Sequence, residues 1–197
     1  MTVTTQRRLH RARAAEFLAP LQAANATEGQ ADIDWVALDA VPHWCFEPPE
    51  YTNKLQLVSG AMFLAPAIRN WIDGKRIQEL RALLGPIAFA AVARSSAVTG
   101  SSENFEVAED VPEALARGGA SVMLGAIDNA DVRALLGTLF PMDVEPIDQS
   151  IANAIYEISL STVHQAIVAE KTADNKAAAQ AALTAESPVK ELAENGQ

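Results

Sequence analysis

Cysteine, aromatic residues and long apolar runs are all scarce in this chain of 197 residues. The single cysteine, Cys45, excludes a disulfide within the chain, and a protein without disulfides is typical of a reducing compartment. Two uncharged runs stand out, residues 55–68 and 82–93, but both are shorter than the roughly 20 residues that a membrane-spanning helix needs. We therefore expect a cytoplasmic protein without membrane insertion, in which both runs form core helices.

The scarcity of aromatic residues, only 6%, also argues against a β-sheet protein, because strands favour aromatic and β-branched side chains. Alanine, the best helix former, accounts for 38 residues, and hydrophobic residues for 49%. The composition predicts an all-α fold with a compact multi-helix domain. We expect a basic N-terminal helix and linker over residues 1–30, the helical domain over 31–176, and a flexible tail with a fraying helix over 177–197.

Motifs for catalysis are missing as well. The chain has no GxxxxGK[ST] or GxGxxG phosphate loop, no GxSxG nucleophile turn, no HExxH and no CxxC. His43 and Cys45 would supply half of a metal site, but no second pair completes it. We therefore expect no catalytic residue, no cofactor and no metal, and we interpret Gly118-Gly119 as a helix interruption rather than a nucleotide loop.

One polar arrangement leaves an alternative open. Glu157, Ser161 and His164 are spaced three and four residues apart, which puts them on one face of a helix. Such a line can act as a base and a nucleophile, as in a small helical enzyme. A solvated polar stripe is the more common interpretation.

The charge is strongly uneven along the chain. The net charge is −10, and residues 101–170 hold twelve acidic residues against two basic ones, whereas residues 54–94 hold six basic residues against two acidic ones. An acidic protein is repelled by a phosphate backbone, so we expect no nucleic-acid partner. Two regions of opposite sign are most often solvated helix faces; the alternative is two protein-binding surfaces, with Glu103, Glu106 and Glu109 as candidates on the acidic one.

Proline, glycine and capping residues predict where the helices begin and end. Helices are expected over Thr5–Ala24; from a cap at Thr52 or Asn53 to about Trp71, with a kink at Pro66; over Lys75–Leu84 after Asp73; from Pro86 to Val98 after a C-cap at Gly85; from Pro112, interrupted at Gly118-Gly119; over Val132–Phe140 after Asp128 or Asn129; and from about Asp148 through Glu170. Core packing is the default role of Trp44, Phe46 and Trp71, which flank the apolar helices. Because aromatic residues often anchor interfaces, the three are also candidates for partner binding.

Residues 34–95 resemble a known family. Trp35 and Trp44 are followed by a proline step, an apolar helix that ends in Ala-Pro-Ala-Ile-Arg-Asn-Trp (65–71), the turn Ile-Asp-Gly-Lys-Arg (72–76), and Leu-Arg-Ala-Leu-Leu-Gly (80–85). This order is similar to that of the SctK family of bacterial type III secretion accessory proteins (the YscK, MxiK and OrgA group). The similarity covers about a third of the chain.

The resemblance implies a non-enzymatic adaptor of the cytoplasmic sorting platform. Its partners would be the inner-membrane ring protein and the pod protein of the platform, and its location would be peripheral, at the inner-membrane base of the secretion apparatus. The family has no catalytic motif to transfer to this chain. The alternatives are a small helical enzyme of unknown chemistry and a helical chaperone or regulatory protein that binds a client helix.

Overall fold

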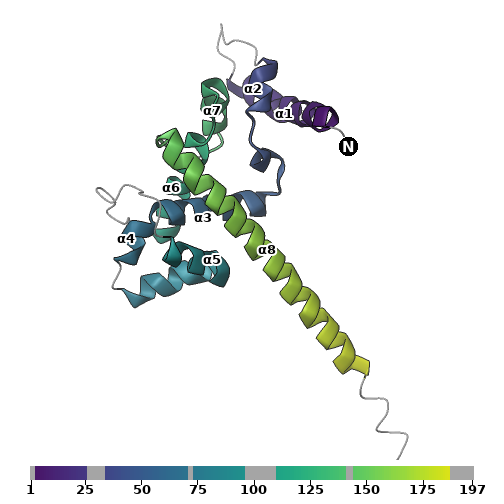
Figure 1. Ribbon diagram of the computed structural model, residues 1–197, viewed down its shortest axis with the longest axis vertical. Coiled ribbons are helices and arrows are strands. Elements are labelled where there is room, and N and C mark those ends of the chain that lie inside the picture. The colour runs from purple at the N-terminus through teal and green to yellow at the C-terminus, as the bar shows by residue number, and fades with distance from the viewer. Residues whose placement is uncertain (1–2, 26–33, 71–72, 96–109, 141–143, 187–197) are drawn as a thin grey trace, which may run out of the picture. The chain divides into compact units, whose positions relative to one another are not determined.

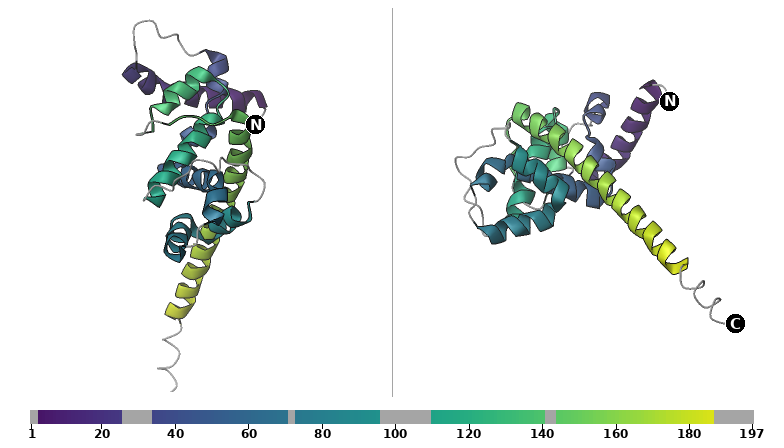
Figure 2. Two further views of the ribbon diagram at one scale, coloured as in Figure 1. Left: turned by 90° about the vertical axis from the view of Figure 1, so that its left-hand side faces the viewer. Right: turned by 60° about the horizontal axis from the view of Figure 1, so that its bottom comes forward.

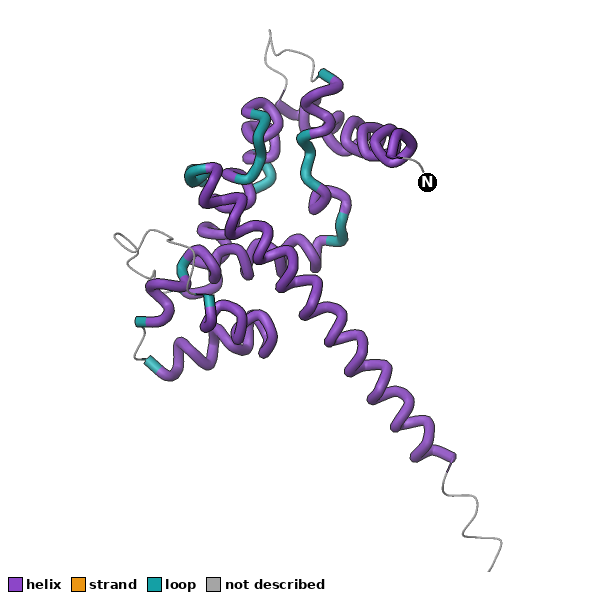
Figure 3. The backbone as a smooth tube through the Cα atoms, in the orientation of Figure 1, coloured by secondary structure: helices purple, strands orange, loops and turns teal. Residues whose placement is uncertain are grey.

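The computed structural model describes residues 3–25, 34–70, 73–95, 110–140 and 144–186. Every regular element in these ranges is a helix, which confirms the all-α prediction (Figures 1 and 3). The chain divides into two compact units, Met1–Val163 and His164–Gln197. Within the described ranges, no helix combines the length and the apolar character that a membrane crossing requires.

The helices are α1 Val3–Asn25, α2 Trp35–Asp39, the short 3-10 helix η1 His43–Phe46, α3 Pro49–Phe63, α4 Ala65–Arg69, α5 Gly74–Arg94, α6 Val111–Gly125, α7 Ala130–Gly137 and α8 Gln149–Glu186.

Two of the expected caps are confirmed. The side chain of Asp73 accepts a hydrogen bond from the Lys75 amide at 2.8 Å, and Asn129 accepts from the amides of Asp131 and Val132.

The start of α3 differs from the prediction. The helix begins at Pro49, so neither Thr52 nor Asn53 is its cap. Thr52 lies inside the helix, where its Oγ1 donates to the Trp44 carbonyl at 3.1 Å. Proline is favoured in the first turn, because an amide there has no partner within the helix, and this explains the earlier start.

Proline and glycine do divide the following helices where the sequence indicates. α3 ends at Phe63 and α4 begins at Ala65, one residue before Pro66, which has no amide to continue the ladder. In α5, Gly85 has a φ of 77°, a conformation that glycine adopts without strain, and Pro86 then starts the second half of the helix.

The interruption expected at Gly118-Gly119 is wrong, because α6 runs unbroken through both glycines. Their role is close packing against α3. A Cβ atom at Gly119 would lie 1.8 Å from the Gln56 carbonyl oxygen, and one at Gly60 would lie 1.9 Å from the Leu115 carbonyl oxygen. The two helices therefore approach so closely that only glycine fits at these positions.

The core of the first unit forms around this α3–α6 pair. α5 packs against both helices, and the part of α8 before residue 164 contributes buried side chains. The largest fully buried residues of this unit include Leu55, Met62, Leu80, Leu115, Met123 and Ile155. α1 lies against α2, η1 and α7, and Figure 2 shows the ribbons of these helices from two further sides. Ala14 and Leu18 of α1 are buried.

The second unit contains the rest of α8. The helix expected to run through Glu170 extends to Glu186, and every side chain from residue 170 to 181 is exposed. Alanine and charged residues dominate this stretch, and both sustain a helix without packing. The end of the expected tail, residues 187–197, lies outside the described residues.

Candidate functional site: a groove between α1 and α2

α1 presents one side to the core and another to solvent. Ala14 and Leu18 are buried against the neighbouring helices, whereas Arg8, Ala12 and Ala15 follow one another at helical spacing on an exposed side. The side chains of Ala12 and Ala15 are short, so the helix backbone is accessible along this side.

α2 brings a tryptophan to the same place. Asp34 caps this short helix by accepting a hydrogen bond from the Ala37 amide at 2.7 Å. Trp35 is therefore the first helical residue, while Ala37 and Leu38 turn inward and are buried. The start of α2 thus leaves the Trp35 indole on the surface beside α1.

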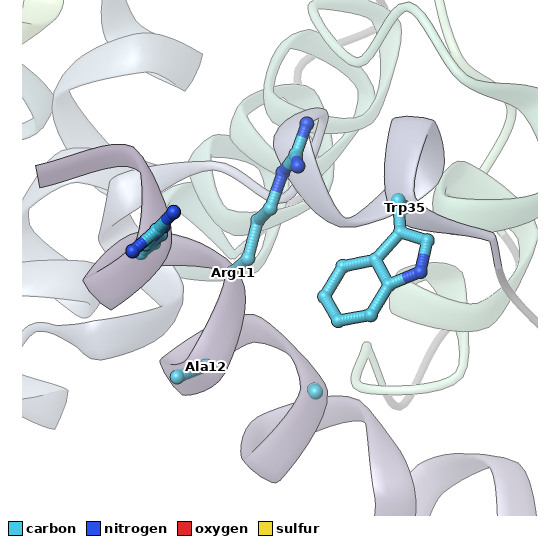
Figure 4. A pocket seen from close by; sticks show the side chains of 5 residues that line it. Arg11, Ala12 and Trp35 are labelled. Carbon is cyan, nitrogen blue, oxygen red and sulfur yellow. The ribbon is translucent and has the colours of Figure 1, made fainter. Parts of the chain in front are cut away.

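Together the two helices form an open groove. Arg8, Arg11, Ala12 and Ala15 from α1 and Trp35 from α2 line a cavity of about 580 Å³. In Figure 4 the indole of Trp35 lies opposite the turn of α1 that carries Arg11 and Ala12. The guanidinium of Arg11 is 5.9 Å from the centre of the indole ring, within the range of a cation–π contact.

An ion cluster fixes the edge of the groove. Nε of Arg11 donates to one Asp39 carboxylate oxygen at 2.7 Å, and its terminal nitrogen donates to the other at 2.6 Å. Arg7 donates to the same carboxylate through Nε at 3.0 Å. These hydrogen bonds hold the pKa of Asp39 well below its usual range and raise the pKa of Arg11. Asp39 therefore stays ionised and ties α1 to the end of α2.

The groove carries an excess of positive charge. Arg7 and Arg11 share the single carboxylate of Asp39, and within the described ranges Arg8 has no ion-pair partner. α1 thus brings the guanidinium groups of Arg7, Arg8 and Arg11 to this region against the single carboxylate of Asp39, and Arg8 and Arg11 line the groove itself. The groove is cationic although the whole chain has a net charge of −10.

Two large apolar side chains next to the groove are strongly exposed. Trp35 is 66% and Val36 is 70% accessible to solvent. Tryptophan is among the residue types most enriched at the energetic centres of interfaces. An exposed Trp-Val pair beside a concave surface has the composition of a protein-binding site rather than of a solvated helix end.

Aromatic rings support the opposite side of α1. His10 packs against His43, with ring centres 5.0 Å apart, and against Phe46 at 5.4 Å. Burial and the neighbouring His43 lower the pKa of His10. The sequence places these two histidines 33 residues apart, and the fold brings them together. No set of three metal-ligating side chains forms here or elsewhere among the described residues.

None of the residues predicted for partner binding lines the groove as the structure describes it. Trp44 is buried, with 4% of its surface exposed, and its ring lies 6.3 Å from that of Phe140. Phe46 is half-buried and packs on the rings of His10, Phe17 and His43. The other four predicted residues, Trp71, Glu103, Glu106 and Glu109, lie outside the described residues.

The candidates for catalysis lie in surroundings that do not activate them. Burial raises the pKa of the Cys45 thiol to about 12, which keeps it protonated and unreactive. Glu157, Ser161 and His164 each have an exposed side chain. Solvent exposure gives none of the three the low-dielectric surroundings in which catalytic groups are activated.

The sequence does contain a signal for the groove. Trp35 and Val36 follow the helix-capping residue Asp34 directly, so they occupy the first turn of α2. The buried side of α2 begins at Ala37, which leaves this large apolar pair facing solvent. The basic residues at positions 7, 8 and 11 show that one flank of α1 is cationic. Only the fold shows that the two features meet.

No protein-family model, no curated protein and no solved structure matches the chain.

Proposed function

We propose that this chain is a non-enzymatic helical adaptor that binds a partner protein through the α1–α2 groove. The observation that carries the proposal is the exposed Trp35-Val36 pair at the edge of the groove. Burying a tryptophan at an interface contributes about 2 kcal/mol or more of binding energy. A residue of this kind on the surface of a chain with few aromatic residues is most simply explained by a partner that covers it.

The more specific form of the proposal is an adaptor of a bacterial type III secretion apparatus. The resemblance of residues 34–95 to the SctK family supports it, and the groove contains Trp35, the first aromatic residue of that segment. The partners would then be the inner-membrane ring protein and the pod protein of the sorting platform. The site of action would be cytoplasmic, at the inner-membrane base of the apparatus.

The experiment is an affinity purification from the native cell with a tag after Gln197, analysed by mass spectrometry. The unchanged chain is compared with Trp35→Ala and with Val168→Ala, which removes an apolar side chain that is 50% exposed on α8. We expect ring and platform proteins with the unchanged chain and with Val168→Ala, and at least a tenfold lower recovery with Trp35→Ala.

Two results would contradict the proposal. Equal recovery of the same proteins with Trp35→Ala would show that the groove is not the binding site. Recovery of none of the ring and platform proteins would remove the secretion-apparatus form of the proposal. Circular dichroism of Trp35→Ala is the control for folding, because an exposed side chain should be dispensable for the helix content.

A further inference from the structure

We infer that the groove between α1 and α2 docks an acidic, helical segment of the partner protein. In this arrangement an apolar side chain of the partner covers Trp35, and its carboxylates pair with Arg8 and the neighbouring arginines. The inference rests on the proposed function, because it specifies which kind of partner the adaptor surface accepts.

Charge is the first argument. α1 carries four arginines, Arg7, Arg8, Arg11 and Arg13, and one acidic residue, Glu16. Only one carboxylate, Asp39, is hydrogen-bonded to these arginines within the described ranges, and it is already shared by Arg7 and Arg11. Of these arginines Arg8 and Arg11 line the groove, and Arg8 has no ion-pair partner among the described residues, which is complementary to a partner that contributes carboxylates.

Shape is the second argument. Arg8, Ala12 and Ala15 span eight residues of α1, and the seven steps between the first and the last cover about 10 Å along the helix axis at 1.5 Å per step. Small residues on one helix let a second helix approach closely, and two turns of contact match this length. The indole of Trp35 forms the wall of the groove against which an apolar side chain of the docked helix can pack.

A phosphate-rich surface fits the groove less well than a protein. Lipid headgroups and nucleic acids are bound by clusters of about four to eight basic residues that stay free to pair with phosphate. Here only two arginines, Arg8 and Arg11, line the groove, and Arg11 is already paired with the ionised carboxylate of Asp39. The net charge of −10 adds a general repulsion of polyanions.

The test uses the full chain and two synthetic peptides labelled with fluorescein. Both are 16-residue helix formers with a leucine stripe at positions i, i+3, i+4 and i+7; one has glutamate at the flanking positions and the other has glutamine. Fluorescence anisotropy measures binding at 50 and 200 mM salt. We expect the glutamate peptide to bind at least ten times more tightly than the glutamine peptide, with an affinity that falls as salt is added.

Two variants of α1 provide a matched pair. Arg8→Glu reverses the charge in the groove, and Arg13→Glu makes the same change at an exposed position that does not line it. We expect Arg8→Glu to weaken binding of the glutamate peptide at least tenfold and Arg13→Glu to weaken it less than twofold. Trp35→Ala should weaken both peptides.

Several results would overturn the inference and leave the proposed function intact. The first is equal affinity for the two peptides, and the second is equal effects of Arg8→Glu and Arg13→Glu. The third is that neither peptide binds although the purification recovers partners with the unchanged chain and loses them with Trp35→Ala. Binding of phosphatidylserine vesicles that Trp35→Ala abolishes would identify a membrane surface instead. A dimer, seen by light scattering and lost in Trp35→Ala, would identify a second copy of this chain.

Discussion

The close approach of α3 and α6 makes a sharp prediction about two adjacent glycines. Replacing Gly119 by alanine places a Cβ atom 1.8 Å from the Gln56 carbonyl oxygen and 2.6 Å from its carbonyl carbon. Both are backbone atoms of a helix, so no side-chain rotation relieves the overlap. The same change at Gly118 places the new Cβ 3.4 Å from a Phe63 side-chain atom, which is an ordinary contact.

Two opposing effects set the change in the free energy of unfolding for Gly119→Ala. Alanine in place of glycine stabilises a helix interior by about 1 kcal/mol. Restoring an ordinary contact at Gly119 requires α3 and α6 to separate by about 1.6 Å, the difference between 3.4 and 1.8 Å. A gap of even 0.5–1 Å removes about a quarter to a half of the dispersion energy of each contact. The loss of folding free energy should therefore lie near the upper end of the roughly 1–3 kcal/mol typical of overpacked cores. We expect Gly119→Ala to lower the free energy of unfolding by about 2 kcal/mol.

Gly118→Ala is the matched control, and it should leave the free energy of unfolding unchanged or raise it by up to about 1 kcal/mol. The assay is urea denaturation of both variants and the unchanged chain, followed by far-ultraviolet circular dichroism. The helix pairing described for α3 and α6 would be refuted if Gly119→Ala were as stable as Gly118→Ala. Gly60→Ala, with its Cβ 1.9 Å from the Leu115 carbonyl oxygen, should behave like Gly119→Ala.

Two further predictions concern titratable groups in and near η1. Because burial raises the pKa of the half-buried Cys45 to about 12, a thiol reagent at pH 7.5 should label the native chain about 100-fold or more slowly than the chain in urea; equal rates would contradict the raised pKa. Because the pKa of His10 in the folded chain is lowered from 6.5, the unfolded chain takes up the proton first as the pH falls, so the free energy of unfolding should decrease below about pH 6.5. His10→Gln should remove this decrease in urea titrations at pH 5.5 and 7.5, whereas His164→Gln, at an exposed position, should retain it.

Local features of the fold were predictable because they depend on neighbours in the sequence. Asp73 and Asn129 cap helices with their own side chains, and Gly85 and Pro86 set the backbone that separates the two halves of α5. The abundance of alanine and the scarcity of aromatic residues indicate an all-helical chain before any contact is known. Thr52 is the exception, since a proline three residues earlier starts the helix first.

The role of Gly118-Gly119 could not be predicted in the same way. Two adjacent glycines weaken a helix by propensity, so an interruption is the expectation from local energetics. The helix continues because the missing side chains let α6 pack closely against α3, which stabilises it. The backbone that it packs against, around Gln56, lies 63 residues away in the sequence. Tertiary packing therefore overrides propensity at this point.

The sequence by itself determined the helical class of this protein, most of its caps and breaks, and the separation of charge along the chain, because composition and local spacing control these properties. Only the tertiary structure decided that Trp44 is buried while Trp35 is exposed, and that His10 meets His43. It also decided that the arginines of α1 meet Trp35 and Asp39 in one groove. The physical reason is that burial and long-range contacts depend on which helix faces are covered by distant parts of the chain, and a linear pattern does not specify that choice.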